Sequence, residues 1–228
     1  MQLGIKDVAR LLEVSEKTVY RWVEEGKLPA YRINDQHRFN RAELLEWATA
    51  RRMKVSPDIY KEVEGGEQAG LPSLSEALAE GGVHGPLVVP DKAEALKAAV
   101  ALLPLPPEAD RSFLLEMLLS REQAGSTGVG EGVAIPHARS PVVAQVQRPI
   151  VTLCYLEPAV DFGAPDGRPV HALFAIVSTT IRSHLHLLSR LAFVLREDSF
   201  KALLEKRAPL EAVLAEARRV EANLGKKG

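Results

Sequence analysis

Cysteine, long apolar runs and a secretion leader are scarce or missing in this 228-residue chain. Cys154 is the only cysteine, which excludes an internal disulfide and is typical of a reducing compartment. No apolar run approaches the ~20 residues that cross a bilayer, and no basic segment followed by an apolar stretch marks a signal peptide at the N-terminus. The sequence therefore predicts a cytoplasmic protein with no membrane partner.

The composition, 46% hydrophobic and 26% charged, is that of an ordinary globular protein. The length allows one domain of about 150 residues and a small additional module. The net charge of −1 is unevenly distributed, because residues 1–54 hold eleven basic and eight acidic residues, a net +3. The basic excess lies at the N-terminal end, as expected if that end meets nucleic acid.

Residues 1–54 have the pattern of a helix-turn-helix with a wing. Apolar residues recur with helical spacing from Ile5 to Leu12, and Ser15 is placed to cap a second helix over residues 16–25. Gly26 is predicted to end that helix in a left-handed conformation. Residues 31–33 and 38–39 flank a polar turn and predict a small hairpin, and residues 41–53 predict a closing helix.

This segment, with its run KLPAYR followed by RF, resembles the excisionase/MerR-like winged helix-turn-helix family. The early part of a second helix reaches base edges and phosphates in the major groove, and a wing flanks the duplex. The predicted DNA contacts are therefore Lys17, Thr18, Tyr20 and Arg21 on the helix and Arg32 and Arg38 on the wing. The alternative is a solvated basic face on a protein-interaction module. A half-site module of this size needs a dimer or a second contact to bind DNA with useful affinity. A homodimer is therefore one possible arrangement.

The stretch REQAGSTGVGEGVAIPHARSP, residues 121–141, has the residues for phosphoryl chemistry. It begins with an arginine, continues as a Gly/Ser/Thr loop, and ends in a short apolar strand, residues 133–135. Pro136 fixes its own φ and stops the strand, so His137 is predicted to stand exposed at the strand end. Backbone N–H groups and hydroxyls in such a loop can bind an anion such as phosphate. No Gly-Lys-Ser/Thr follows, so the loop is not a P-loop.

The order REQAGSTGVG and then VAIPH closely resembles the signature of phosphotransferase-system enzyme IIA domains of the fructose/mannitol type, including their nitrogen-regulatory branch. The resemblance implies an α/β fold with a mixed sheet flanked by helices. The chemistry that it implies needs no cofactor and no metal. It implies that His137 is the phosphoryl acceptor, with His184 and Arg121 as further catalytic residues. Ser126, Thr127 and Arg139 are the implied phosphate-binding residues. Arg121 has an alternative role as a charge at a helix C-terminus.

A zinc site is not expected. His184 and His186 are two residues apart on a predicted helix, so they point in different directions and cannot both face one ligand.

The predicted organisation is a DNA-binding domain over residues 1–54, a linker over 55–73, an enzyme IIA domain over 74–218 and a tail over 219–228. In the third segment, helices are predicted at 74–79, 92–103, 112–123, 183–196, 199–205 and 210–217. Strands are predicted at 87–89, 132–135, 150–156 and 170–176. Phe113, Leu114, Met117 and Leu118 are expected to face inward from the third of these helices.

Three functions are compatible with this organisation. The first is a DNA-binding regulator whose His137 is phosphorylated by an HPr-type phosphocarrier protein. The second is a phosphocarrier that passes the phosphoryl group to a separate sugar-transporter enzyme IIB. The third is a sensor of phosphorylation state that binds regulatory protein partners instead of double-stranded DNA. No enzyme IIB segment is visible in the sequence, which favours a regulatory use.

Overall fold

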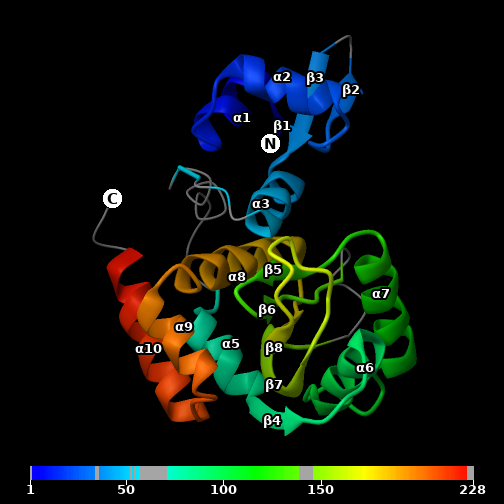
Figure 1. The fold of residues 1–228 in the computed structure, drawn as a ribbon, viewed down its shortest axis with the longest axis vertical. Helices are drawn as coiled ribbons and strands as arrows, with labels where there is room; N and C mark the ends of the chain where they lie inside the picture. Colours follow the sequence, from blue (N-terminus) through cyan, green and yellow to red (C-terminus); the bar gives the residue numbers. More distant parts are fainter. Residues whose placement is uncertain are drawn as a thin grey trace. The chain divides into compact units, whose positions relative to one another are not determined.

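We describe the protein from a computed structural model, which covers residues 2–33, 36–51, 53, 55–56, 71–138 and 146–224. The chain forms two compact units, Met1–Ala69 and Gly70–Gly228, and each is treated by itself (Figure 1). Most of the predicted linker lies outside the described residues. Within them, no helix has both the length and the apolar character needed to cross a membrane.

The N-terminal unit combines helices with a small sheet. Along the chain it contains β1 (Gln2–Leu3), α1 (Ile5–Leu11), α2 (Glu16–Glu24), β2 (Tyr31–Ile33), β3 (Gln36–Asn40) and α3 (Arg41–Ala50). The sheet has the order β1-β3-β2, with both pairings antiparallel. The hairpin predicted as a wing is β2 and β3, while β1 adds a strand that the sequence pattern did not predict.

The predicted start of the second helix is confirmed by its capping contact, and the helix ends at Glu24, one residue before the predicted end. The Ser15 hydroxyl accepts a hydrogen bond from the Thr18 N–H at 3.1 Å, and Gly26 has a φ of +65°. Trp47 lies in the core of this unit and the partly buried Trp22 packs against it, with the two ring centroids 5.3 Å apart. Burial of these rings joins α2 to α3 and makes the unit one hydrophobic core.

The second unit is a mixed sheet between two layers of helices, which confirms the predicted fold class. Its helices are α5 (Leu74–Gly81), α6 (Lys92–Leu102), α7 (Arg111–Gln123), α8 (Ile181–Val194), α9 (Asp198–Glu205) and α10 (Leu210–Leu224). Its strands are β4 (Val83–Leu87), β5 (Gly128–Gly130), β6 (Val133–Ala134), β7 (Ile150–Val160) and β8 (Val170–Val177). The order is β4-β7-β8-β6-β5, with β4/β7 and β6/β8 parallel and the other pairs antiparallel.

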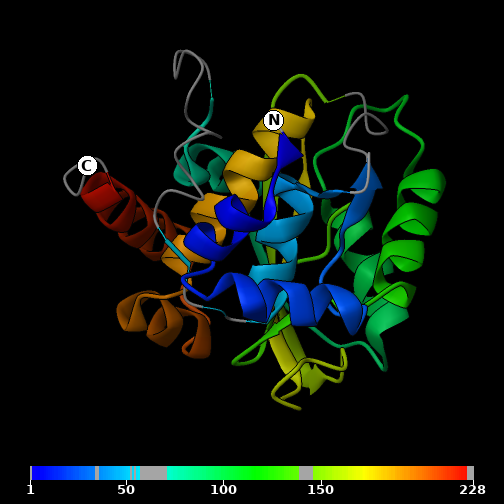
Figure 2. The same ribbon diagram turned by 90° about the horizontal axis from the view of Figure 1, so that it is seen from above.

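Side chains that alternate along the central strands fill two separate cores. Val151, Leu153 and Tyr155 of β7 pack in the core with α5, α8, α9 and α10. Ile150 and Cys154, on the opposite face, pack in the core with α6 and α7. Figures 1 and 2 show the green helices α6 and α7 on one side of the sheet and the orange-to-red helices α9 and α10 on the other. Both faces of β7 and β8 are therefore buried, as expected for strands this apolar.

Several element boundaries differ from the sequence predictions. The edge strand β4 lies at Val83–Leu87 instead of 87–89, and Val88 is 82% exposed. Helix α8 begins at Ile181 because Thr180 caps it in a capping box with Ser183. Helix α10 continues to Leu224, through part of the predicted tail. Phe113, predicted to face inward, is 46% exposed, so that prediction was wrong.

Candidate functional site

His137 lies three residues beyond the end of β6 and immediately after Pro136. The backbone there continues beside β8, and His137 forms an isolated parallel β-bridge with Ile176 of that strand. The ring Nδ1 lies 2.7 Å from the carbonyl oxygen of Ile135. The residue is only 4% exposed, so the prediction of an exposed histidine was wrong. Because a carbonyl oxygen can only accept a hydrogen bond, Nδ1 carries the proton, and in the neutral ring the lone pair is on Nε2.

His184 comes from the first turn of α8 and lies beside His137. The two ring centroids are 5.2 Å apart, with the planes inclined by 42°, and His184 is also 4% exposed. His186, two residues later, bonds instead to the backbone of Pro72, and burial lowers its pKa to about 4. The structure thus brings His137 and His184 together and directs His186 elsewhere, as helical spacing predicts.

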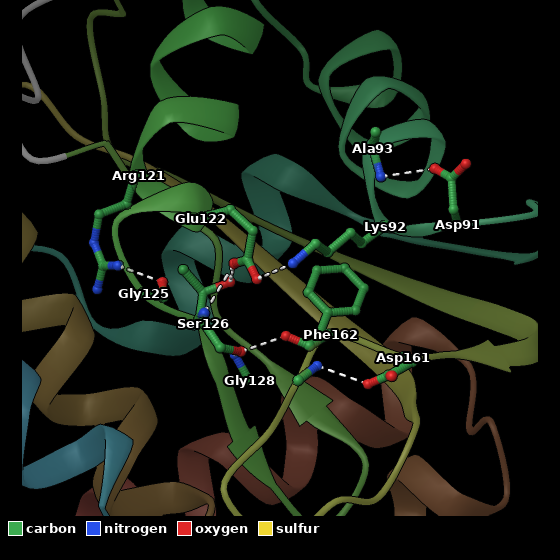
Figure 3. A network of polar contacts seen from close by, with 12 residues as sticks. Asp91, Lys92, Ala93, Arg121, Glu122, Gly125, Ser126, Gly128, Asp161 and Phe162 are labelled. Atoms are coloured by element: carbon green, nitrogen blue, oxygen red, sulfur yellow. Dashed lines mark hydrogen bonds and ion pairs between the residues drawn. The ribbon is translucent and has the colours of Figure 1, made fainter.

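Arg121 and Ser126 are held by protein groups in the loop after α7 (Figure 3). Arg121 Nη1 donates to the carbonyl oxygen of Gly125 at 2.9 Å, across the helix C-terminus. The Ser126 hydroxyl donates to the carbonyl oxygen of Phe162 at 2.6 Å and accepts from the Gly128 N–H at 3.0 Å. These contacts shape the loop, and the predicted phosphate-binding roles of both residues remain predictions. Arg139 lies outside the described residues.

Thr127, another predicted phosphate ligand, is bound to a carboxylate that the sequence analysis did not single out. Its N–H and hydroxyl both donate to Oε2 of Glu122, at 2.8 Å and 2.5 Å. Glu122 is 4% exposed, and its Oε1 lies 3.6 Å from the ammonium of Lys92. A sequence signal existed, because Leu114 and Leu118 are buried and Glu122 continues their spacing of four residues along α7.

A pocket lies at the other end of β6, away from His137. It is a cavity of about 350 Å³ lined by Glu131, Gly132, Arg168, Pro169, His171, Glu205 and Arg207. Burial lowers the pKa of His171, and its Nε2 is buried with no hydrogen-bond partner among the described residues. His137 follows the C-terminal end of β6, whereas this cavity lies at the turn that precedes the strand, so the two places are separate.

The part of the chain that the structure describes contains no group of three or more His, Cys, Asp or Glu side chains close enough to hold a metal ion. The only cysteine, Cys154, is fully buried in the sheet, and burial raises its pKa to about 12. A thiol in that state is a poor nucleophile. Of the reactive side-chain types, the histidine pair is therefore the group best placed for chemistry.

The N-terminal unit presents its predicted DNA contacts on α2 and on the β2–β3 hairpin. Lys17, Arg21 and Arg32 are exposed, and Tyr20 is 46% exposed. The Tyr20 ring meets the His37 ring edge-on, with centroids 6.2 Å apart, so the helix and hairpin surfaces are contiguous. The side chains of Thr18 and Arg38 are engaged within the protein: the Thr18 hydroxyl hydrogen-bonds to the hydroxyl of the N-cap Ser15 at 2.8 Å, and Arg38 Nη2 donates to Gln36 at 2.5 Å.

Comparison with known proteins supports the division into two kinds of domain. The family model described as "Phosphoenolpyruvate-dependent sugar phosphotransferase system, EIIA 2" matches residues 77–217. A helix-turn-helix domain model matches residues 3–52. The two matches correspond to the two compact units.

Relatives of this chain include a nitrogen regulatory protein and a fructose-specific component of the phosphotransferase system. The chain is 38% identical over 109 residues to the "Nitrogen regulatory protein" of Pseudomonas aeruginosa, covering 47% of this chain and 69% of that protein. It is 42% identical over 99 residues to the "PTS system fructose-specific EIIABC component" of Bacillus subtilis, covering 42% of this chain but only 15% of that protein. The crystal structure of nitrogen regulatory protein IIA-Ntr from Neisseria meningitidis matches with a TM-score of 0.53 and 30% identity, over 64% of this chain and 96% of that one.

Proposed function

Because the chain belongs to the EIIA 2 family of the phosphotransferase system and joins such a domain of the nitrogen-regulatory type to a helix-turn-helix domain, we propose that it is a phosphorylation-controlled DNA-binding regulator. His137 accepts a phosphoryl group from an HPr-type phosphocarrier protein. The phosphorylation state of His137 then changes the affinity of the helix-turn-helix unit for double-stranded DNA.

The observation that carries the proposal is the contact between His137 Nδ1 and the Ile135 carbonyl oxygen at 2.7 Å. It supports Nε2 as the nucleophile, because Nδ1 is occupied by its proton. In the transfer step, Nε2 forms a bond to phosphorus while the phosphorus–nitrogen bond of the carrier phosphohistidine breaks. The electron pair of that bond stays on the carrier imidazole, so no metal, oxidant or further reactant is required.

His184 is the second histidine of the proposed site. Its ring, 5.2 Å from that of His137, is near enough to interact with a phosphoryl group carried on Nε2. The family resemblance implies Arg121, Ser126, Thr127 and Arg139 around that group, although in the structure the donors of Ser126 and Thr127 are held by Phe162 and Glu122. Stabilisation of the transferred charge by fixed donors is the main contribution that such a site makes to the reaction.

Phosphorylation adds about −1.5 to −2 charges, which is enough to reorder a loop or a protein contact. In the proposal this charge appears beside α8, which carries His184. In the proposal, the rearrangement that this charge causes makes the DNA affinity of the phosphorylated chain differ from that of the unphosphorylated chain.

The first experiment measures acid-labile phosphate incorporation from phosphoenolpyruvate, enzyme I and an HPr-type carrier. The native chain should be labelled, and His137→Ala should remove the label. His84→Ala is the matched control, because His84 lies in the edge strand β4 and bonds to the carbonyl oxygen of Gly81. A native chain that takes no label from either the sugar-branch or the nitrogen-branch carrier would refute the proposal.

The second experiment tests DNA binding by retardation of a duplex at several salt concentrations. Lys17→Ala and Arg21→Ala should each weaken binding and reduce the slope of log affinity against log salt by about one, as expected for a lost phosphate contact. Lys97→Ala, in the larger unit, should change neither quantity. If the native chain does not retard DNA in either phosphorylation state, the protein acts through protein partners. Transfer of label to a purified enzyme IIB would show a phosphocarrier instead.

A further inference from the structure

Glu122 is a buried carboxylate next to the proposed phosphorylation site. It lies in the last turn of α7, and only 4% of the residue is exposed. A buried carboxylate is retained only where a cation or several donors compensate its charge. Here Oε2 accepts hydrogen bonds from both the N–H and the hydroxyl of Thr127. Its Oε1 faces the ammonium of Lys92 at 3.6 Å (Figure 3). The carboxylate is thus fixed on both sides.

The contacts of Glu122 continue through the backbone as far as the His137 ring. The carbonyl oxygen of Thr127 accepts the Ile135 N–H at 2.9 Å. The carbonyl oxygen of Ile135 then accepts the proton on His137 Nδ1 at 2.7 Å. A continuous series of hydrogen bonds therefore runs from Glu122 to Thr127, Ile135 and His137.

We propose that Glu122 is a positioning residue for the phosphoryl acceptor. By holding both donors of Thr127, it fixes the loop against the segment that follows β6 and keeps the Ile135 carbonyl directed at Nδ1. This selects the tautomer of His137 that leaves Nε2 as the nucleophile. Glu122 itself need not touch the phosphoryl group. The inference rests on the proposed function, since it assigns a purpose to the tautomer of His137.

The side-chain type required at this position follows from the contacts. Both Thr127 donors converge on one oxygen, so a glutamine can replace the acceptor while giving up the ion pair with Lys92. Methionine has a similar length but replaces the oxygens with poor acceptors, which leaves two donors of Thr127 unsatisfied. Glu122→Met is therefore the disruptive variant, and Glu122→Gln is its conservative rescue.

The test combines the ring tautomer with the transfer rate in the full-length chain. Long-range ¹H–¹⁵N NMR of the imidazoles should show Nδ1–H for His137 in the native protein and a measurable share of Nε2–H in Glu122→Met. The initial rate of phosphorylation by the carrier should fall at least tenfold in Glu122→Met, and Glu122→Gln should recover it to within about threefold of the native rate. Glu116→Met, on the exposed side of α7, should change neither the tautomer nor the rate.

A variant with a smaller perturbation covers the case in which Glu122→Met does not fold. Thr127→Val removes the hydroxyl donor and keeps the N–H donor, so it should shift the tautomer in the same direction and lower the rate about threefold. An unchanged Nδ1–H tautomer in whichever of these variants is folded would refute the positioning role. The tautomer is read without phosphoryl transfer, so a native Nδ1–H signal in a chain that takes no label would refute the proposed function alone.

Discussion

Gly132 stands at a turn where both the backbone and the space exclude a side chain. Its φ is +75°, a conformation that costs an L-residue about 1–2 kcal/mol. A Cβ there would lie 2.1 Å from Nδ1 of His171 and 2.5 Å from its Cε1, far inside van der Waals contact. Relieving such an overlap by moving the half-buried His171 ring costs about 1–3 kcal/mol. Gly132→Ala should therefore lower the free energy of unfolding of the larger unit by about 3 kcal/mol.

The two contributions are separable by a double-mutant cycle. In a His171→Ala background the ring is absent and only the backbone cost remains, so the same substitution should cost about 1 kcal/mol. The coupling energy between the two positions is then about 2 kcal/mol, which is within the range measured for residues in contact.

The assay is urea denaturation of the full-length chain followed by two signals. Both tryptophans, Trp22 and Trp47, belong to the N-terminal unit, so their fluorescence reports that unit. Far-UV circular dichroism reports both units. Gly132→Ala should shift the circular dichroism transition of the larger unit and leave the fluorescence transition in place. An equal cost of the glycine substitution with and without the His171 ring would refute the steric argument.

Three further predictions concern single sites. Ser15→Ala removes the hydroxyl that accepts the Thr18 N–H and should lower the stability of the N-terminal unit by about 1 kcal/mol, measured by tryptophan fluorescence, whereas Ser15→Asp should restore it. Burial holds the pKa of His186 at about 4, below its ordinary 6.5. As the pH falls from 6.5 to 4, the unfolded chain therefore binds a proton at His186 that the folded chain does not, and the free energy of unfolding falls by up to about 3 kcal/mol. His186→Gln should remove this part of the pH dependence of unfolding, and an unchanged slope between pH 4 and 6.5 would contradict it. Gly81→Ala would place a Cβ 2.2 Å from the carbonyl oxygen of Val151, a backbone atom that cannot move aside, so the larger unit should show no folded circular dichroism transition.

The sequence predicted the parts of the fold that leave a side-chain pattern. The helix-turn-helix was predicted from the apolar spacing of α1 and the capping residue Ser15. The central strands β7 and β8 were predicted from continuous apolar runs. Strand β5 was missed, because Gly128–Gly130 has almost no side chains, and its pairing with β6 rests on backbone hydrogen bonds. Strand β4 was misplaced because a Gly-Pro pair, typical of turns, lies inside it.

The sequence predicted the two histidines of the candidate site but not the residues that hold them in place. The motif resemblance pointed to His137 and His184, and the fold places their rings side by side. Burial of His137 depends on how α8 packs over the strand end, which no local pattern encodes. The contacts of Glu122 with Thr127 and Lys92 join segments that periodicity alone cannot pair, although the spacing of α7 predicts that a carboxylate at that position is buried.

The two outer strands of the larger unit bear on how it meets other proteins. In the described sheet these are β4 and β5, the first containing Pro86 and the second only three residues long with a glycine at each end. Proline has no N–H to donate, and a strand this short offers few backbone groups for pairing. The sheet is therefore protected against extension by a strand of another molecule. Recognition of another protein by this unit would then depend on the side chains of its helices and loops.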